Sequence, residues 1–258
     1  MALQPKKLVP YALAGWLPGG RRRCALCGHR VWRFMPYRNG SRSTAPLMHA
    51  LEVIGSDVDN FECPRCGAHD RERHLLLYLR ASGLMDRLAG LRILHFAPER
   101  RLAHLVASQS PVEYVCCDLH PAAPGVQRVD MQAMPFDAAS FDLVIANHVL
   151  EHVNDDGVAI GEITRVLAPG GHAILQTPYS PRLHRTWSDL GIDGEAARFH
   201  AYGQEDHVRL FGRDVFERFQ SAGLLSCVAS HDVLLPHIDA SEWGVNGQEP
   251  FFLFRKPG

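Results

Sequence analysis

The sequence has no long apolar run. No stretch approaches the ~18 consecutive apolar residues of a membrane-spanning helix, which argues against an integral membrane protein. The apolar segment after Lys6 and Lys7 resembles a signal peptide, but Pro10 and Pro18 interrupt it and no convincing small-residue cleavage site follows. We therefore expect residues 1–20 to form a leader that packs on the surface, and the protein to be cytoplasmic.

The sequence also lacks a large net charge. A formal charge of −1 over 258 residues, with 46% hydrophobic content, is typical of a globular protein with one large domain or two unequal ones. It argues against a general nucleic-acid-binding role. The amino-terminal segment instead lacks acids: residues 1–51 contain nine Lys or Arg, and the first acidic residue is Glu52. Such a basic module can attract phosphate, although a solvated basic face explains the same pattern.

Four of the seven cysteines form two pairs of identical spacing. The pairs are Cys24-Ala-Leu-Cys27-Gly28 and Cys63-Pro-Arg-Cys66-Gly67, separated by 35 residues. Two residues between the thiolates, followed by glycine, form a tight knuckle that aims both sulfurs at one ion, and two knuckles complete a tetrahedral shell with no open position. We therefore predict a structural zinc ion in a zinc-ribbon or treble-clef module over residues 21–68. Disulfides are the alternative, which a cytosolic protein disfavours.

After the cysteines, apolar runs alternate with helical patterns. The leucine-rich segment 69–90 predicts a connecting helix, and Ile160, Ile163 and Val166 repeat at helical spacing in a later one. The runs that we expect to be strands are 92–97, 113–119, 141–147, 172–178, 225–230 and 250–256. Strands separated by helices predict an α/β fold with a doubly wound, mainly parallel sheet, in which ligands bind at the carboxyl ends of the strands.

At its centre this region resembles a known family. The series "D…MPF…SFDLVI…VLEHV…E..RVL.PGG" is similar to class I S-adenosylmethionine-dependent methyltransferases, in the group related to ubiquinone and menaquinone methyltransferases. The resemblance covers residues 91–258 and is strongest over 113–178. It implies a Rossmann-like sheet of seven strands and S-adenosylmethionine as cofactor. Together with the cysteine pairs, the chain resembles a bacterial group of zinc-ribbon methyltransferases.

The resemblance implies roles for residues at the strand ends. Asp118 matches the acid that accepts from both ribose hydroxyls, since a carboxylate offers two acceptor oxygens. Asp130, with the Met131 backbone beside it, matches the acid that binds the adenine amino group, although a turn-stabilising role is the alternative. Asn147 and His148 match positions at the methionine end of the cofactor and the substrate mouth. Glu151 and His152 match the family's "LEH", which more often serves packing.

The stretch "RILHFAPERR" departs from the family pattern because it lacks the glycines of the first cofactor loop. Ala97 is small enough for close approach, and Pro98 can preset the turn before the following helix. We expect Glu99 to pair with the cofactor's methionine ammonium. A helix-start charge without a ligand is the alternative for Glu99.

The acceptor side is predicted in an insertion over residues 179–214. His207 is the best general-base candidate, since a neutral imidazole is available near neutral pH, and Arg209 could clamp a carboxylate or phosphate. With His148 these residues form the predicted catalytic set. A polar loop braced internally by Asp206 is the alternative.

Three functions compete. We favour methyl transfer to a small metabolite or biosynthetic intermediate. The second is an RNA methyltransferase that docks RNA through residues 1–68, and the third is a binding or regulatory protein that keeps the fold without transferring methyl groups. The methyl acceptor and the oligomeric state stay open.

Overall fold

The computed structural model describes residues 5–258, which cluster in two compact units. The cysteine unit contains the residues up to Thr44, Ser56–Met85 and Ser230–Glu249. The sheet unit contains Ala45–Gly55, Asp86–Ala229 and Pro250–Gly258. The two units interleave along the chain, whereas the boundaries predicted from the sequence follow residues 20, 68 and 90. Residues 1–4 of the predicted leader lie outside the described part.

The sheet unit is built on seven strands in the order β5-β4-β3-β6-β7-β9-β8. The strands are β3 (Arg92–Phe96), β4 (Glu113–Asp118), β5 (Gln127–Arg128), β6 (Phe141–Ala146), β7 (Leu167–Ile174), β8 (Leu225–Ser226) and β9 (Leu253–Arg255). Strands β3 to β7 pair in parallel, while β9 is antiparallel to both β7 and β8. This confirms the Rossmann-like, mainly parallel sheet. The apolar pattern missed β5 because its two residues are exposed.

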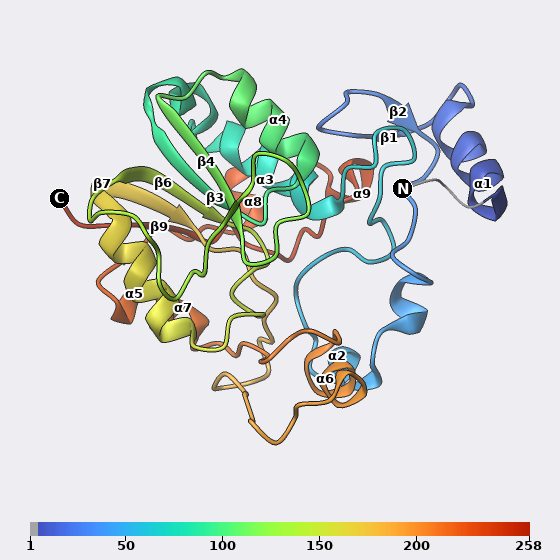
Figure 1. Ribbon diagram of the computed structural model, residues 1–258. Coiled ribbons are helices and arrows are strands. Elements are labelled where there is room, and N and C mark those ends of the chain that lie inside the picture. Colours follow the sequence, from blue (N-terminus) through green and yellow to red (C-terminus); the bar gives the residue numbers. More distant parts are fainter. Residues whose placement is uncertain (1–4) are drawn as a thin grey trace. The chain divides into compact units, whose positions relative to one another are not determined.

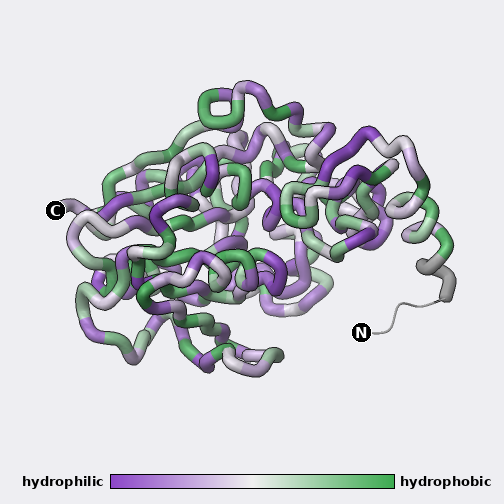
Figure 2. The backbone as a smooth tube through the Cα atoms, turned by 90° about the horizontal axis from the view of Figure 1, so that it is seen from above, coloured by the Kyte–Doolittle hydropathy of each residue, from purple (hydrophilic) through white to green (hydrophobic). Residues whose placement is uncertain are grey.

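Helices cover both faces of this sheet. In Figure 1, α5 (Asp156–Val166) and α7 (Val215–Ser221) lie together on one side of the strands, and α4 (Arg100–Ser108) lies on the other. Helix α5 begins at Asp155, whose side chain accepts a hydrogen bond from the Val158 amide (3.0 Å). Ile160 and Ile163 of α5 pack into the main buried cluster with Phe219 of α7. The hydropathy colouring shows apolar and polar segments alternating along the chain (Figure 2).

The insertion carries a helix that the sequence did not indicate. Helix α6 (Glu195–Tyr202) packs on the short helix α2 (Pro46–Ala50), and Met48 and Tyr202 belong to their shared buried cluster. Helix α6 ends at Gly203, whose φ of +94° is the left-handed conformation that glycine adopts without strain. Residues 46–50 are therefore part of the sheet unit and support its insertion.

The cysteine unit has little regular sheet. Strands β1 (Arg22–Arg23) and β2 (Arg30–Val31) form its antiparallel pair, and its helices are α1 (Pro5–Trp16), α3 (Asp70–Ala81), α8 (His231–Leu234) and α9 (Ala240–Trp243). Short 3-10 turns lie at Gly40–Ser43 and Met85–Gly90. The predicted connecting helix thus ends at residue 81, and Gly83 follows at a φ of +72°. In the described part of the chain, no helix has the length and apolar character needed to cross a membrane.

Candidate functional site

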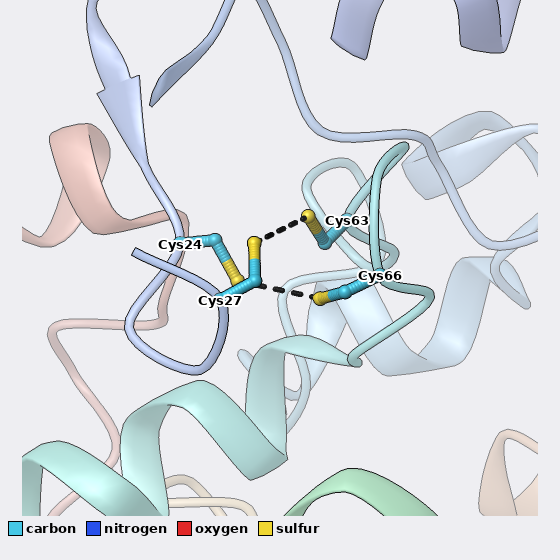
Figure 3. A group of neighbouring side chains, drawn as sticks. All are labelled: Cys24, Cys27, Cys63 and Cys66. Carbon is cyan, nitrogen blue, oxygen red and sulfur yellow. Dashed lines mark hydrogen bonds between the residues drawn. The ribbon is translucent and has the colours of Figure 1, made fainter. Parts of the chain in front are cut away.

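The four predicted zinc ligands come together in the cysteine unit. Their side chains converge from two loops (Figure 3), and all four sulfurs lie within 4.8 Å of one another. The Sγ atoms of Cys24 and Cys66 are 3.7 Å apart, and those of Cys27 and Cys63 are 4.0 Å apart. Tetrahedral sulfurs at about 2.3 Å from a zinc ion lie about 3.8 Å from one another. The geometry and the donor set fit zinc, and all the cysteines are free thiols rather than disulfides.

Each loop is the knuckle that the spacing predicted. The Gly28 amide donates to the Cys24 carbonyl, and the Gly67 amide donates to the Cys63 carbonyl, both at 2.9 Å. Both glycines have positive φ values, 71° and 74°, which a side chain would strain. The two halves of the site therefore repeat one backbone design on unrelated segments.

A buried cation lies beside the thiols. Arg73 of α3 is fully buried, and its guanidinium stacks on the Phe34 ring at 3.9 Å from the centroid. Its five hydrogen bonds go to the carbonyls of Asn60, Phe61, Ala68, Trp243 and Gly244. Burial lowers the pKa of Arg73, and the charges of Asp70 and of three cysteines oppose that shift. Four thiolates around a zinc ion would leave excess negative charge, which this guanidinium would offset.

The predicted cofactor residues gather at the carboxyl ends of three adjacent strands. Phe96 of β3 pairs with Cys117 of β4 and with Ala146 of β6, so the residues that follow each strand meet at one edge of the sheet. Ala97 is the first residue beyond β3, and its φ of +45° is the left-handed conformation usual for glycine. Alanine thus adopts the backbone shape of the missing glycine at the cost of some strain.

Glu99 lies at the centre of this edge. It precedes α4 and is 9% exposed. Its Oε1 accepts a hydrogen bond from the Asn147 Nδ2 (2.7 Å), and its Oε2 lies 3.6 Å from the Nε2 of buried His95. The other end of the Asn147 amide, Oδ1, is buried and has no hydrogen-bond partner within residues 5–258. A carboxylate beside an unsatisfied buried acceptor fits a cationic donor such as an ammonium group.

The two predicted nucleoside acids differ in their surroundings. Asp118 ends β4, is half-buried, and accepts from the His120 amide (2.8 Å), which leaves a carboxylate with further acceptor capacity. Asp130 is exposed and accepts from the amide of Gln132 (2.9 Å). This contact is the turn-stabilising role that the sequence left open for Asp130. Met131 beside it is buried.

Beyond β6 the chain forms a cluster of histidines around one acid. Glu151 is 1% exposed; its Oε2 accepts from the Thr177 hydroxyl (3.0 Å), and its Oε1 lies 3.5 Å from the His148 Nδ1. Burial raises the pKa of a carboxyl group, but the neighbouring His148, His152 and His207 outweigh that effect and lower the pKa of Glu151 below its usual range. The sequence does not indicate this cluster, because His207 is distant in the chain from His148, Glu151 and His152.

Two of the predicted catalytic residues belong to this cluster. His148 has a φ of +55° and directly follows the β6 edge. His207 is 3% exposed, and its Nδ1 binds the Tyr202 carbonyl (3.0 Å). Its Nε2 is buried and has no hydrogen-bond partner in the described part of the chain. Burial lowers the pKa of His207, although Glu151 opposes that shift. A general-base role for His207 stays a prediction.

Comparison with known proteins agrees with the topology. Residues 99–175 match the family model described as a methyltransferase domain. The matched residues lie within the sheet unit, whose strand order is that of a Rossmann-like methyltransferase fold. The chain is 30% identical over 161 residues to the phthiotriol/phenolphthiotriol dimycocerosates methyltransferase of Mycobacterium leprae (strain TN), covering 55% of this chain and 58% of that protein. It is 34% identical over 82 residues to the malonyl-[acyl-carrier protein] O-methyltransferase of Erwinia billingiae (strain Eb661), covering 31% and 33%.

Among solved structures, the S-adenosylmethionine-dependent methyltransferase of Mesorhizobium loti aligns with a TM-score of 0.46 and 17% identity, over 69% of this chain and 96% of that one. The chain spans less than two thirds of the length of the two curated relatives named above.

In the sheet unit, the Arg209 side chain braces the loop after β6. Its Nη1 donates to the carbonyls of Leu150 (2.8 Å) and Val153, its Nη2 donates to Asn154 (2.7 Å), and the side chain is 4% exposed. Asp156 lies 3.5 Å away and offsets its charge. These contacts tie the loop after β6 to the insertion. An anion clamp at Arg209 therefore has no support in the structure, because its outer nitrogens already bind the protein.

Proposed function

We propose that the protein is an S-adenosylmethionine-dependent methyltransferase that acts on a small metabolite or biosynthetic intermediate. The observation that carries this proposal is the buried Asn147 Oδ1 beside Glu99, at the sheet edge of a segment that matches a methyltransferase domain. The amide orientation is chemically constrained, because turning it over would place Oδ1 against the Glu99 carboxylate. The pair thus offers a negative charge and an acceptor to one cationic group.

Each residue of the edge takes one part of the cofactor in this proposal. Glu99 and Asn147 hold the methionine ammonium. Asp118 accepts hydrogen bonds from the ribose hydroxyls through the lone pairs that do not accept from the His120 amide. Asp130 and the Met131 backbone flank the adenine. Ala97 keeps the turn after β3 narrow, since its methyl group is the smallest side chain after glycine.

The cofactor, when bound, supplies a methyl group on sulfonium that an acceptor can take by in-line displacement. The protein then has to position the acceptor, exclude water and accept a proton where one leaves. Asn147 and His148 directly follow β6, so the acceptor side begins next to the proposed ammonium site. His148 and His207 offer imidazoles near this acceptor side.

A small acceptor is favoured over RNA by two observations. The two relatives above are named for phthiotriol/phenolphthiotriol dimycocerosates and for malonyl-[acyl-carrier protein]. The cysteine unit is also less basic than its first segment: four acids and no Lys or Arg come from residues 230–249. Arg22 of this unit is already bound to Asn60 and to the Ser241 carbonyl. We further propose that the four cysteines hold a structural zinc ion.

Calorimetry with S-adenosylmethionine tests the cofactor site. We expect Asp118→Ala to weaken binding roughly 10- to 100-fold, because a hydrogen bond to a charged group contributes about 1.5–3 kcal/mol. Glu99→Gln should weaken it as well, since the ammonium loses its counter-charge. Asp137→Ala, at an exposed acid of the loop after Asp130, is the matched control and should bind like the wild type. Absence of binding to folded, zinc-loaded wild type contradicts the proposal.

Transfer of a tritiated methyl group into fractionated metabolites and RNA of the source cell identifies the acceptor class. We expect label in small molecules with wild type and none with Asp118→Ala. Label in RNA would instead support docking through the cysteine unit. Cofactor binding without any transfer would favour the binding or regulatory protein.

A further inference from the structure

The cluster beyond β6 has the composition of a metal centre. Glu151, His152 and His207 each offer one ligand atom, and these atoms lie within 4.8 Å of one another. All three residues belong to the sheet unit, so they share no ligand with the four cysteines. We propose that they bind a divalent transition-metal ion, as a second site with two imidazoles and one carboxylate.

The hydrogen bonds of both histidines select the nitrogen that faces the ion. The Nδ1 of His207 is bound to the Tyr202 carbonyl (3.0 Å), and the Nδ1 of His152 lies 3.3 Å from the Asp206 carbonyl and 3.4 Å from its carboxylate. An imidazole that donates through Nδ1 to an oxygen presents its Nε2 lone pair outward, which is how metal-bound histidines are usually oriented. Both rings are thus prepared as Nε2 ligands.

One of these nitrogens has no other use. The Nε2 of His207 is buried and has no hydrogen-bond partner among the described residues, and the side chain is 3% exposed. A buried nitrogen without a partner costs free energy, on the order of 1–3 kcal/mol. A metal ion at this position would remove that cost and would neutralise the buried Glu151 carboxylate.

Contacts with neighbouring side chains also orient the Glu151 carboxylate. The Thr177 hydroxyl donates to the Glu151 Oε2 (3.0 Å), and the Nδ1 of His148 lies 3.5 Å from Oε1. Ligands at about 2.1 Å from an ion in tetrahedral geometry lie about 3.4 Å apart, so closure needs a small inward movement of the side chains. The rings of His152 and His207 already meet edge to face, with centroids 4.8 Å apart.

Three protein ligands leave at least one coordination position open, in contrast to the four-cysteine cluster. His152 is 34% exposed, which gives an ion and a further ligand access from solvent. A methyl acceptor that binds through a hydroxyl or carboxylate oxygen fits that position, and the ion would favour its deprotonated form. This last step rests on the proposed methyl transfer, whereas the metal site itself does not.

Metal binding is measured on the full chain with zinc in the cysteine site and with neither cofactor nor acceptor. We expect zinc-saturated wild type to hold two ions per chain by elemental analysis. Added Co²⁺ should bind to protein that carries only the first zinc and show ligand-field bands without thiolate charge transfer. His152→Ala and Glu151→Gln should hold one ion and lose the Co²⁺ bands. His200→Ala, at an exposed histidine of α6, is the control and should hold two.

His152 is the deciding position because its side chain is 34% exposed, so its replacement by Ala disturbs the packing less than a replacement of buried His207. A single ion in wild type, or unchanged Co²⁺ bands in His152→Ala, would overturn the site. S-adenosylmethionine binding, measured in parallel with His152→Ala, separates the two proposals. Loss of the second ion from His152→Ala with intact cofactor binding supports both proposals. If the wild type binds the second ion but no cofactor, the metal site stands and the methyltransferase proposal is wrong.

Discussion

The cysteine cluster and the core of the sheet are held together by different means. Around the four sulfurs, the buried cluster consists of Cys24, Cys63, Val31, Phe34 and Ala68. The sheet instead buries apolar residues from its central strands together with one face of α5 and of α7. Only a small buried cluster surrounds the sulfurs. In the proposed zinc site, bonds to the ion and one buried cation would therefore supply the stabilisation that buried apolar area supplies in the sheet. Local damage should therefore be severe in the first region and graded in the second.

The largest effect is expected from removing a ligand. Cys63→Ser should lose the zinc ion and unfold the cysteine unit, because structural zinc sites contribute roughly 10 kcal/mol or more in small domains. Elemental analysis reads the ion. Tryptophan fluorescence measures the unfolding of the cysteine unit, because three of the four tryptophans lie in it: Trp16, Trp32 and Trp243. The fourth, Trp187, lies in the sheet unit. Cys227→Ser, at an exposed cysteine of the sheet unit, should change neither signal. A folded Cys63→Ser unit without metal would contradict the comparison.

A smaller but still large effect is expected at the buried cation. Arg73→Met keeps most of the side-chain volume but leaves five carbonyls without their donors and removes the charge beside the thiolates. We expect a loss of about 3–5 kcal/mol in the free energy of unfolding of the cysteine unit. Urea unfolding followed by tryptophan fluorescence measures it. Arg80→Met, an exposed arginine of the same helix, should cost less than about 0.5 kcal/mol. Equal losses in both variants would remove Arg73 from this role.

The smallest effect, with the opposite sign, is expected in the sheet unit. Ala97→Gly relieves the left-handed strain at the turn after β3 but adds chain entropy to the unfolded state, and we expect a net gain of about 0.5 kcal/mol. Urea unfolding followed by circular dichroism measures it. Ala103→Gly, inside α4, is the matched control and should lose about 1 kcal/mol. A destabilised Ala97→Gly protein would show that the methyl group itself packs in this turn.

What could be predicted from the sequence was set by distance along the chain. The cysteine knuckles are local, and their spacing alone predicted their backbone conformation. The same spacing predicted a role as metal ligands. Strand ends such as Asp118 and Asn147 followed from the α/β pattern, because parallel strands present their carboxyl ends at one edge. The short strand β5 was not predicted, because its two residues carry no apolar pattern.

Sites formed by distant segments could not be read in the same way. Glu151 and His207 meet because the insertion returns to the end of β6, and no local pattern encodes that path. Arg209 is informative in the same respect. Its charge and its neighbours predicted an anion clamp, whereas the structure turns the guanidinium toward loop carbonyls. A donor's availability depends on its packing, which residue type does not show.

The position of the Arg73 acceptors bears on how the chain is made. All four cysteines precede Arg73, so the metal ligands leave the ribosome early. The carbonyls of Trp243 and Gly244 that complete the Arg73 contacts follow 170 and 171 residues later. Contacts of such separation form late in folding. The proposed zinc ion could thus bind the nascent chain before the hydrogen bonds of Arg73 to residues 243 and 244 can form. A chain stopped before residue 243 would keep its sulfur ligands but lack two acceptors for their neighbouring charge.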